Sequence, residues 1–188
     1  MRAFALTLGL GLMSVLVACD SGTSDGSTPT SDGSTPTDGA VTGPSLEAAT
    51  LKQCDGTDFD LLAEVAKAKV TYITWGAGWC SACEKEVPII NTDIVEGFAG
   101  QPVQAMQILI ENGPGEAPPL PLCEQWVNNL GAEFTVLADV EQVTVPQYFS
   151  EGIGTLPRHM LITEDGVIVF DAFGAYPTDL VQRIQDWL

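Results

Sequence analysis

The chain has 188 residues, of which 25 are acidic and 7 are Lys or Arg, and its formal net charge at pH 7 is −18. The electrostatic field of so negative a protein repels nucleic acid and anionic lipid surfaces. The composition therefore argues against nucleic-acid binding and favours a basic partner protein. The alternative is that the charge only keeps an exported protein soluble.

Residues 1–18 resemble a bacterial lipoprotein signal peptide. Arg2 is followed by an apolar stretch, residues 3–17, that is too short to span a bilayer comfortably, and small Ala18 stands before Cys19. The resemblance implies cleavage before Cys19 and lipid attachment to it, which would anchor the protein in the cell envelope, facing the periplasm or the exterior. The alternative is an ordinary signal peptide in which Cys19 is coincidental.

Residues 19–45 are predicted to form a disordered tether that follows the lipidated cysteine. They contain almost no large apolar side chain, and the heptapeptide Ser-Asp-Gly-Ser-Thr-Pro-Thr at 24–30 recurs at 31–37. Such a segment cannot bury enough apolar surface to offset the entropy lost on ordering. The remaining residues, 46–188, have the size and apolar content of one domain.

A strand is predicted over 69–75, because β-branched and aromatic residues fill it. Apolar residues at helical spacing then predict a helix over 81–98, which Pro88 should kink without ending. Between the two lies the most informative feature of the chain, Trp79-Cys80-Ser81-Ala82-Cys83. Its cysteines are therefore expected on the first turn of the helix, where a sulfur can be held as a reactive thiolate.

The rest of the domain is predicted to alternate between strands and helices and to close with a hairpin and a helix. The predicted strands span 103–110, 134–138, 158–163 and 167–171, and the predicted helices span 121–130, 141–150 and 178–188. This order of elements predicts an α/β sandwich with a mixed sheet.

The segment from Trp75 to Pro88 contains every fixed position of the W-x-x-x-W-C-x-x-C-x-x-E-x-P pattern. It therefore resembles the TlpA/ResA-like thiol-disulfide oxidoreductases of the thioredoxin superfamily. Gly154-Thr155-Leu156-Pro157 before a strand resembles the cis-proline loop of that superfamily. The resemblance implies a thioredoxin-like three-layer sandwich, with a mixed central β-sheet and helices on both faces, over residues 46–188.

Two positions depart from the family pattern. Thr74 stands where thioredoxin has a buried aspartate, and Glu86 is the acid that the TlpA/ResA-like pattern offers instead. Arg158 follows the proline where the family commonly has threonine. Arg158 is expected either to form a surface salt bridge or to favour an anionic group, such as a thiolate, near the site.

Cys80 is expected to be the nucleophile and Cys83 the resolving thiol. Unpaired N–H groups and the dipole at a helix N-terminus favour negative charge on the first sulfur. Cys83, one turn further in, would attack the mixed disulfide and release the substrate. No cofactor is expected beyond this redox-active Cys80–Cys83 couple.

Glu86, Trp79, Leu156 and Pro157 complete the predicted site. Glu86 follows Cys83 by three residues, so it could accept the proton of Cys83, or it could be a solvated helix carboxylate. Trp79 should shield the disulfide, while Trp75 reads as a core aromatic. If Pro157 is cis, the backbone of Leu156 is open to strand-like pairing with a substrate peptide beside Cys80.

Cys54 and Cys123 are the two cysteines that remain. An even remainder in an exported protein suggests a structural disulfide between them. Two free buried thiols or a second redox relay are the alternatives.

His159 is the only histidine of the chain, so a metal site built on Cys80 and Cys83 would need His159 as a further ligand. A lone histidine on a strand is more often structural, and no metal site is predicted.

The predicted function is that of a lipid-anchored, monomeric, extracytoplasmic thiol-disulfide oxidoreductase. Family likeness favours a reductant of protein disulfides, with apocytochrome c as one plausible client and a membrane thiol-disulfide donor upstream. Two other readings stay open. One is a metallochaperone with Cys80, Cys83 and His159 as ligands, and the other is a non-catalytic adaptor on the same fold.

Overall fold

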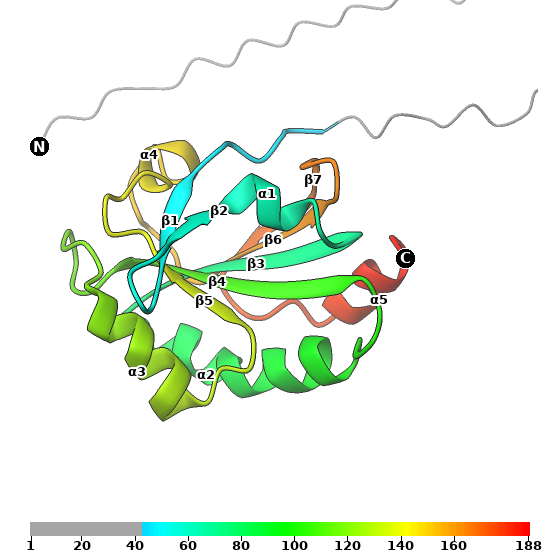
Figure 1. Cartoon of the computed structure of the whole chain (residues 1–188), viewed down its shortest axis with the longest axis horizontal. Coiled ribbons are helices and arrows are strands. Elements are labelled where there is room, and N and C mark those ends of the chain that lie inside the picture. The colour runs from blue at the N-terminus through cyan, green and yellow to red at the C-terminus, as the bar shows by residue number, and fades with distance from the viewer. Residues whose placement is uncertain (1–42) are drawn as a thin grey trace, which may run out of the picture. The chain divides into compact units, whose positions relative to one another are not determined.

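Seven strands form one mixed sheet in the computed structural model, which describes residues 43–188 (Figure 1). The strand order is β2-β1-β5-β4-β3-β6-β7. The three central strands are parallel to one another, and the outer strands are antiparallel to their neighbours. The strands are β1 (Thr50–Gln53), β2 (Asp58–Asp60), β3 (Val70–Ala77), β4 (Val103–Glu111), β5 (Thr135–Ala138), β6 (Arg158–Thr163) and β7 (Ile168–Phe173).

Helices cover both faces of this sheet (Figure 1). One face carries α1 (Leu61–Val65) and α4 (Val145–Tyr148), and the other carries α2 (Ser81–Ile90), α3 (Leu120–Leu130) and α5 (Leu180–Gln185). A π-helical segment, η1 (Asn91–Glu96), continues α2. The predicted three-layer α/β sandwich with a mixed sheet is therefore confirmed.

The alternation of side chains along β3 explains why its whole length is buried. Ile73 and Trp75 pack into the cluster beneath α1 and α4, whereas Val70 and Tyr72 pack into the cluster beneath α2 and α5. A strand covered on both faces reads as a continuous apolar run, which is how the sequence predicts it. The carboxyl end of β3 leads directly into Cys80.

Several predicted boundaries differ from those observed. The helix predicted over 81–98 changes to π geometry at Asn91, three residues after Pro88, whose ring nitrogen carries no hydrogen to donate. The closing helix is shorter than predicted and spans Leu180–Gln185. No element was predicted before residue 69, yet β1, β2 and α1 lie there.

Residues 44 and 45, which the sequence analysis assigns to the predicted tether, pair with residues 167 and 168 in the structure. The carbonyl of Pro44 accepts a hydrogen bond from the N–H of Ile168, and Ser45 forms a β-bridge with Val167. The predicted signal peptide (1–18), the lipidated Cys19 and most of the predicted tether (19–45) lie outside the described residues. Between residues 43 and 188, no helix is long and apolar enough to cross a membrane.

Candidate active site

Cys80 and Cys83 lie at the first turn of α2 and are joined by a disulfide bond. Cys80 is the N-cap residue, and its sulfur accepts a hydrogen bond from the N–H of Cys83 over 3.1 Å. The exposed fraction is 5% for Cys80 and 0% for Cys83, so Cys80 is the only one of the two residues with any exposed surface. This placement gives Cys80 the N–H groups and the dipole of a helix N-terminus.

Two glycines before the motif let the chain pass close to its neighbours. A Cβ on Gly76 would lie 3.3 Å from the Cβ of Cys83 and 2.8 Å from Nε2 of Gln107. A Cβ on Gly78 would lie 2.8 Å from the carbonyl oxygen of Asn112. The sequence assigns no role to either glycine, because the two shortest contacts, with Gln107 and Asn112, are made with residues distant in the chain.

Trp79 lies at the surface beside Cys80 and is held by a buried carboxylate. The residue is 42% exposed, and its Nε1–H donates to Oε2 of Glu111 over 2.8 Å. The other oxygen of Glu111 accepts from the N–H of Gly115, also over 2.8 Å. Sequence reasoning missed Glu111, although an acid at the end of an apolar strand was a visible signal.

The loop before β6 brings Leu156 and Pro157 to the same region. The Leu156–Pro157 peptide bond is cis. Leu156 packs against the apolar cluster that contains Cys80 and Cys83, and it also packs against the cluster on the opposite face of the sheet. The structure thus brings Leu156 to the cluster that contains the disulfide, and Pro157 follows it in the same loop.

Arg158 forms a salt bridge, but a largely buried one. Its Nε and Nη2 donate to the two carboxylate oxygens of Asp171 over 2.9 and 2.7 Å, and a further nitrogen donates to the carbonyl of Tyr148. The guanidinium stacks over the ring of Phe173, with its Cζ 4.6 Å from the ring centroid. Because only 9% of Arg158 is exposed, neither a simple surface salt bridge nor an open anion site describes it.

Glu86 is buried between α2 and the sheet rather than solvated. Only 6% of the residue is exposed, and its Oε2 has no hydrogen-bond partner among residues 43–188. Burial raises the pKa of Glu86 to about 7, and a backbone N–H from Tyr176 opposes this rise. A carboxyl group in this condition can take up and release a proton near neutral pH.

His159 is buried on β6 with both ring nitrogens in use. Nδ1 lies 2.8 Å from the hydroxyl of Tyr72, and Nε2 lies 2.9 Å from the carbonyl oxygen of Gly174. Burial lowers the pKa of His159. In residues 43–188, no group of three or more His, Cys, Asp or Glu side chains could hold a metal ion.

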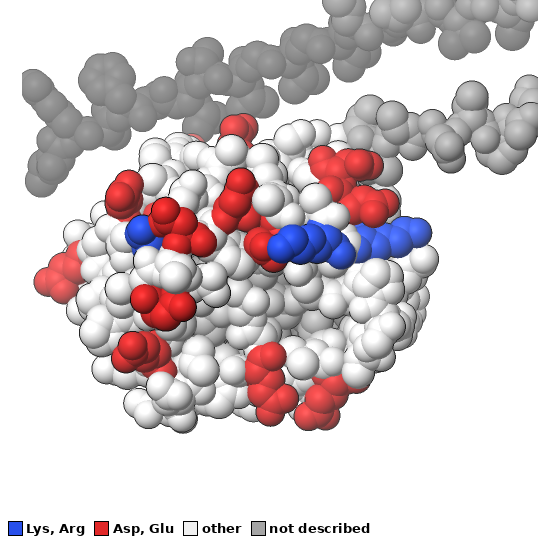
Figure 2. Space-filling view, viewed as in Figure 1, with Lys and Arg blue, Asp and Glu red and all other residues white. Residues whose placement is uncertain are grey.

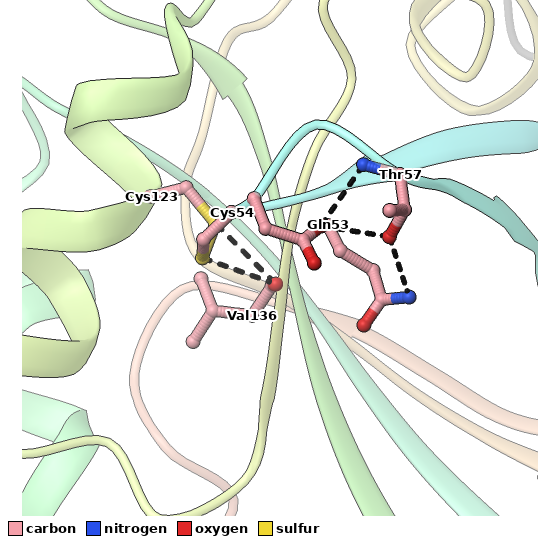
Figure 3. The surroundings of a disulfide bond; sticks show 6 residues. Gln53, Cys54, Thr57, Cys123 and Val136 are labelled. Atoms are coloured by element: carbon pink, nitrogen blue, oxygen red, sulfur yellow. Dashed lines mark hydrogen bonds between the residues drawn. A yellow bond between two sulfur atoms is a disulfide. The ribbon is translucent and has the colours of Figure 1, made fainter.

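Cys54 and Cys123 are joined by a second disulfide, which links the end of β1 to α3 (Figure 3). The sulfurs of Cys54 and Cys123 lie 3.6 and 3.4 Å from the carbonyl oxygen of Val136 on β5. The bond therefore ties α3 to the end of β1 next to β5 of the sheet.

Comparisons with known proteins agree with this geometry. The chain is 28% identical over 108 residues to the thiol-disulfide oxidoreductase ResA of Bacillus thuringiensis (strain Al Hakam), a match that covers 57% of each chain. The chain thus spans little more than half the length of this relative. The resemblance to TlpA/ResA-like proteins that the motif predicts is supported by this match.

Solved structures share the fold at low sequence identity. A thiol:disulfide interchange protein of the thioredoxin family from Chlorobium tepidum TLS matches with a TM-score of 0.61 and 18% identity, over 78% of this chain and 97% of that chain. The exposed lipoprotein thioredoxin Etrx1 of Streptococcus pneumoniae strain TIGR4 matches with a TM-score of 0.58 and 22% identity, over 76% and 100%. The sequence pattern of the AhpC/TSA family matches residues 42–171, so the chain belongs to the AhpC/TSA family.

Proposed function

We propose that the protein is a thiol-disulfide oxidoreductase that exchanges disulfides with protein substrates through Cys80 and Cys83. The observation that carries the proposal is the pair itself: two bridged sulfurs at a helix N-terminus, of which only the first belongs to a residue with any exposed surface, near a cis-proline loop. Disulfide exchange requires a thiolate, and this position favours one.

The proposed cycle begins with the reduced protein. The Cys80 thiolate attacks one sulfur of a substrate disulfide, which forms a mixed disulfide and releases the other substrate sulfur as a thiolate. Cys83 then loses its proton and attacks the sulfur of Cys80, so the Cys80–Cys83 bond forms and the second substrate thiolate leaves. Two electrons have passed from the protein to the substrate.

Glu86 is the proposed acceptor of the proton that Cys83 loses. It is one turn along α2 from Cys83, and its pKa of about 7 leaves it partly ionised at neutral pH. Trp79, Leu156 and Pro157 are the proposed contacts for the substrate chain around its disulfide.

The proposed substrate is a basic, extracytoplasmic protein. Acidic side chains are spread over the face in Figure 2, with few basic ones among them, and the net charge is −18. Such a field speeds encounter with a cationic partner at low salt. Apocytochrome c remains one proposed client, with the protein as reductant and a membrane thiol-disulfide donor upstream.

We also propose that lipid on Cys19 holds the protein to a bacterial membrane.

Midpoint potential is the first test. The Cys80/Cys83 couple is titrated in defined thiol buffers, and mass spectrometry identifies the bridged pair. A potential near that of thioredoxin, roughly −270 mV, supports a reductant, and one near −120 mV makes the protein an oxidant. The absence of any reversible transition at this pair refutes the proposed activity.

Trapping distinguishes the roles of the two cysteines. Cys83→Ser should accumulate a mixed disulfide with a substrate protein, whereas Cys80→Ser should not. A Cys54→Ser/Cys123→Ser double variant is the matched control, because it removes the other disulfide and leaves the motif intact. Equal trapping by Cys80→Ser and Cys83→Ser overturns the assignment.

Cell fractionation of a Cys19→Ser variant tests the anchor, since this variant should leave the membrane fraction.

A further inference from the structure

A buried histidine lies next to the unpartnered oxygen of Glu86. Nε2 of His159 is 3.9 Å from Oε2 of Glu86, and that oxygen accepts no hydrogen bond from any described residue. The side chain of His159 is fully buried, and that of Glu86 is 7% exposed. Water is therefore a poor competitor for the space between the two groups.

The hydrogen bonds of His159 fix its tautomer. The carbonyl oxygen of Gly174 can only accept, so the nitrogen 2.9 Å from it, Nε2, carries the hydrogen. Burial lowers the pKa of His159 and so favours the neutral ring. In that ring Nδ1 is the acceptor and receives the hydroxyl hydrogen of Tyr72 over 2.8 Å. The imidazole is neutral, and its one N–H lies on the side of Glu86.

We propose that His159 is a positioning residue for Glu86, and that its Nε2–H moves from the Gly174 carbonyl toward the carboxylate whenever Glu86 loses its proton. This inference rests on the proposed redox function only where it concerns Cys83. The hydrogen bond stabilises the ionised form of Glu86 without placing a second charge in the interior. His159 thereby sets the pH range in which Glu86 can accept a proton from Cys83.

The other ionisable groups around Glu86 are less suited to donate a hydrogen bond to its carboxylate. Tyr72 on β3 has already donated its hydroxyl to His159. Tyr176, in the segment between β7 and α5, has a buried hydroxyl that makes no hydrogen bond within the described part of the chain. Burial raises the pKa of Tyr176, and the nearby acids Asp93 of η1 and Glu86 raise it further. Tyr176 is thus the competing neutral donor, and the experiment has to separate it from His159.

The experiment follows the carboxyl carbon of Glu86 by 13C NMR across pH in the full chain, purified in detergent. In His159→Phe, which keeps a ring but loses the N–H, the proton affinity of Glu86 should rise at least tenfold. In His159→Gln, which keeps an N–H donor, it should stay within about threefold of the wild type. Tyr176→Phe should also stay within that range, and a shift there as large as in His159→Phe overturns the assignment to His159.

Wild-type protein supplies a test that does not depend on the folding of a variant. The 15N resonance of Nε2 in His159 should remain that of a protonated nitrogen throughout, and its N–H signal should move with the same midpoint as the carboxyl carbon of Glu86. A signal that is unaffected by the titration of Glu86, or an unchanged Glu86 titration in a folded His159→Phe variant, overturns the proposal.

The pH dependence of the midpoint potential is a separate measurement from the NMR titrations. The pH at which the slope of the midpoint potential changes should rise in His159→Phe together with the proton affinity of Glu86. If the Cys80/Cys83 pair shows no reversible transition, the proposed function fails, while the two NMR titrations still decide whether His159 acts on Glu86.

Discussion

Replacing Glu86 by glutamine should stabilise the protein at alkaline pH and leave it unchanged at acid pH. Burial raises the pKa of Glu86 from 4.5 to about 7. One pKa unit corresponds to 1.36 kcal/mol, so ionising this group in the folded protein costs about 3 kcal/mol more than in the unfolded chain. Only a small discount for solvent applies, because the residue is 6% exposed.

The sign of the pH dependence follows from which state binds the proton. Between about pH 4.5 and pH 7 the folded protein keeps a proton on Glu86 that the unfolded chain has released, so the wild type loses stability as pH rises through this window. Glu86→Gln has no such proton to lose. The free energy of unfolding of the variant relative to the wild type should therefore increase by about 3 kcal/mol between acid and alkaline pH.

Urea unfolding of the oxidised protein at several pH values measures this difference. Glu84→Gln is the matched control, because it removes one negative charge from a partly exposed position of the same helix. If Glu86→Gln and Glu84→Gln show the same dependence on pH, the burial of Glu86 does not control its ionisation, and the reasoning is wrong.

Three further predictions concern the frame around the site. Changing both Cys54 and Cys123 to alanine opens a cross-link with a sequence separation of 69, so chain entropy predicts a loss of about 4 kcal/mol in urea unfolding, and a loss below about 1 kcal/mol contradicts it. Glu111→Ala removes the acceptor of the Trp79 indole, so the fluorescence anisotropy of Trp79 should fall while Glu111→Gln, which keeps an acceptor oxygen, retains it. Gly78→Ala puts a Cβ 2.8 Å from a backbone oxygen and should cost about 1–3 kcal/mol in thermal or urea unfolding; an unchanged stability would show that the loop yields freely.

The long elements could be predicted from the sequence because their own residues carry the pattern. β3 and β4 are apolar runs, and α3 has its apolar residues at helical spacing and ends at Gly131 in the left-handed conformation. β1 and β2 could not be predicted in this way. They have four and three residues, and four of these seven residues are exposed. Leu51 gains its strand partner, Phe59, only when the hairpin forms.

The site divides along the same line. The motif places Cys80 and Cys83 at the start of a helix from local sequence alone, and the structure has them there. The partners of Glu111 and Arg158 come from tertiary packing, so no spacing in the sequence indicates them. The burial of Glu86 likewise depends on how closely α2 approaches the sheet.

The approach of α2 to the sheet explains how a carboxyl group with a pKa of about 7 is tolerated there. Thr74 lies in register with Gln107 on β4 and with His159 on β6, so three polar residues form one row across the sheet on a single face. Glu86 reaches this row from the helix side, 3.9 Å from His159. In wholly apolar surroundings the pKa of a carboxyl rises further and the group stays neutral, whereas in water it remains near 4.5 and the group stays ionised. A buried carboxyl group between α2 and a row of polar residues has a pKa between these two limits. Under this condition Glu86 can exchange a proton at neutral pH.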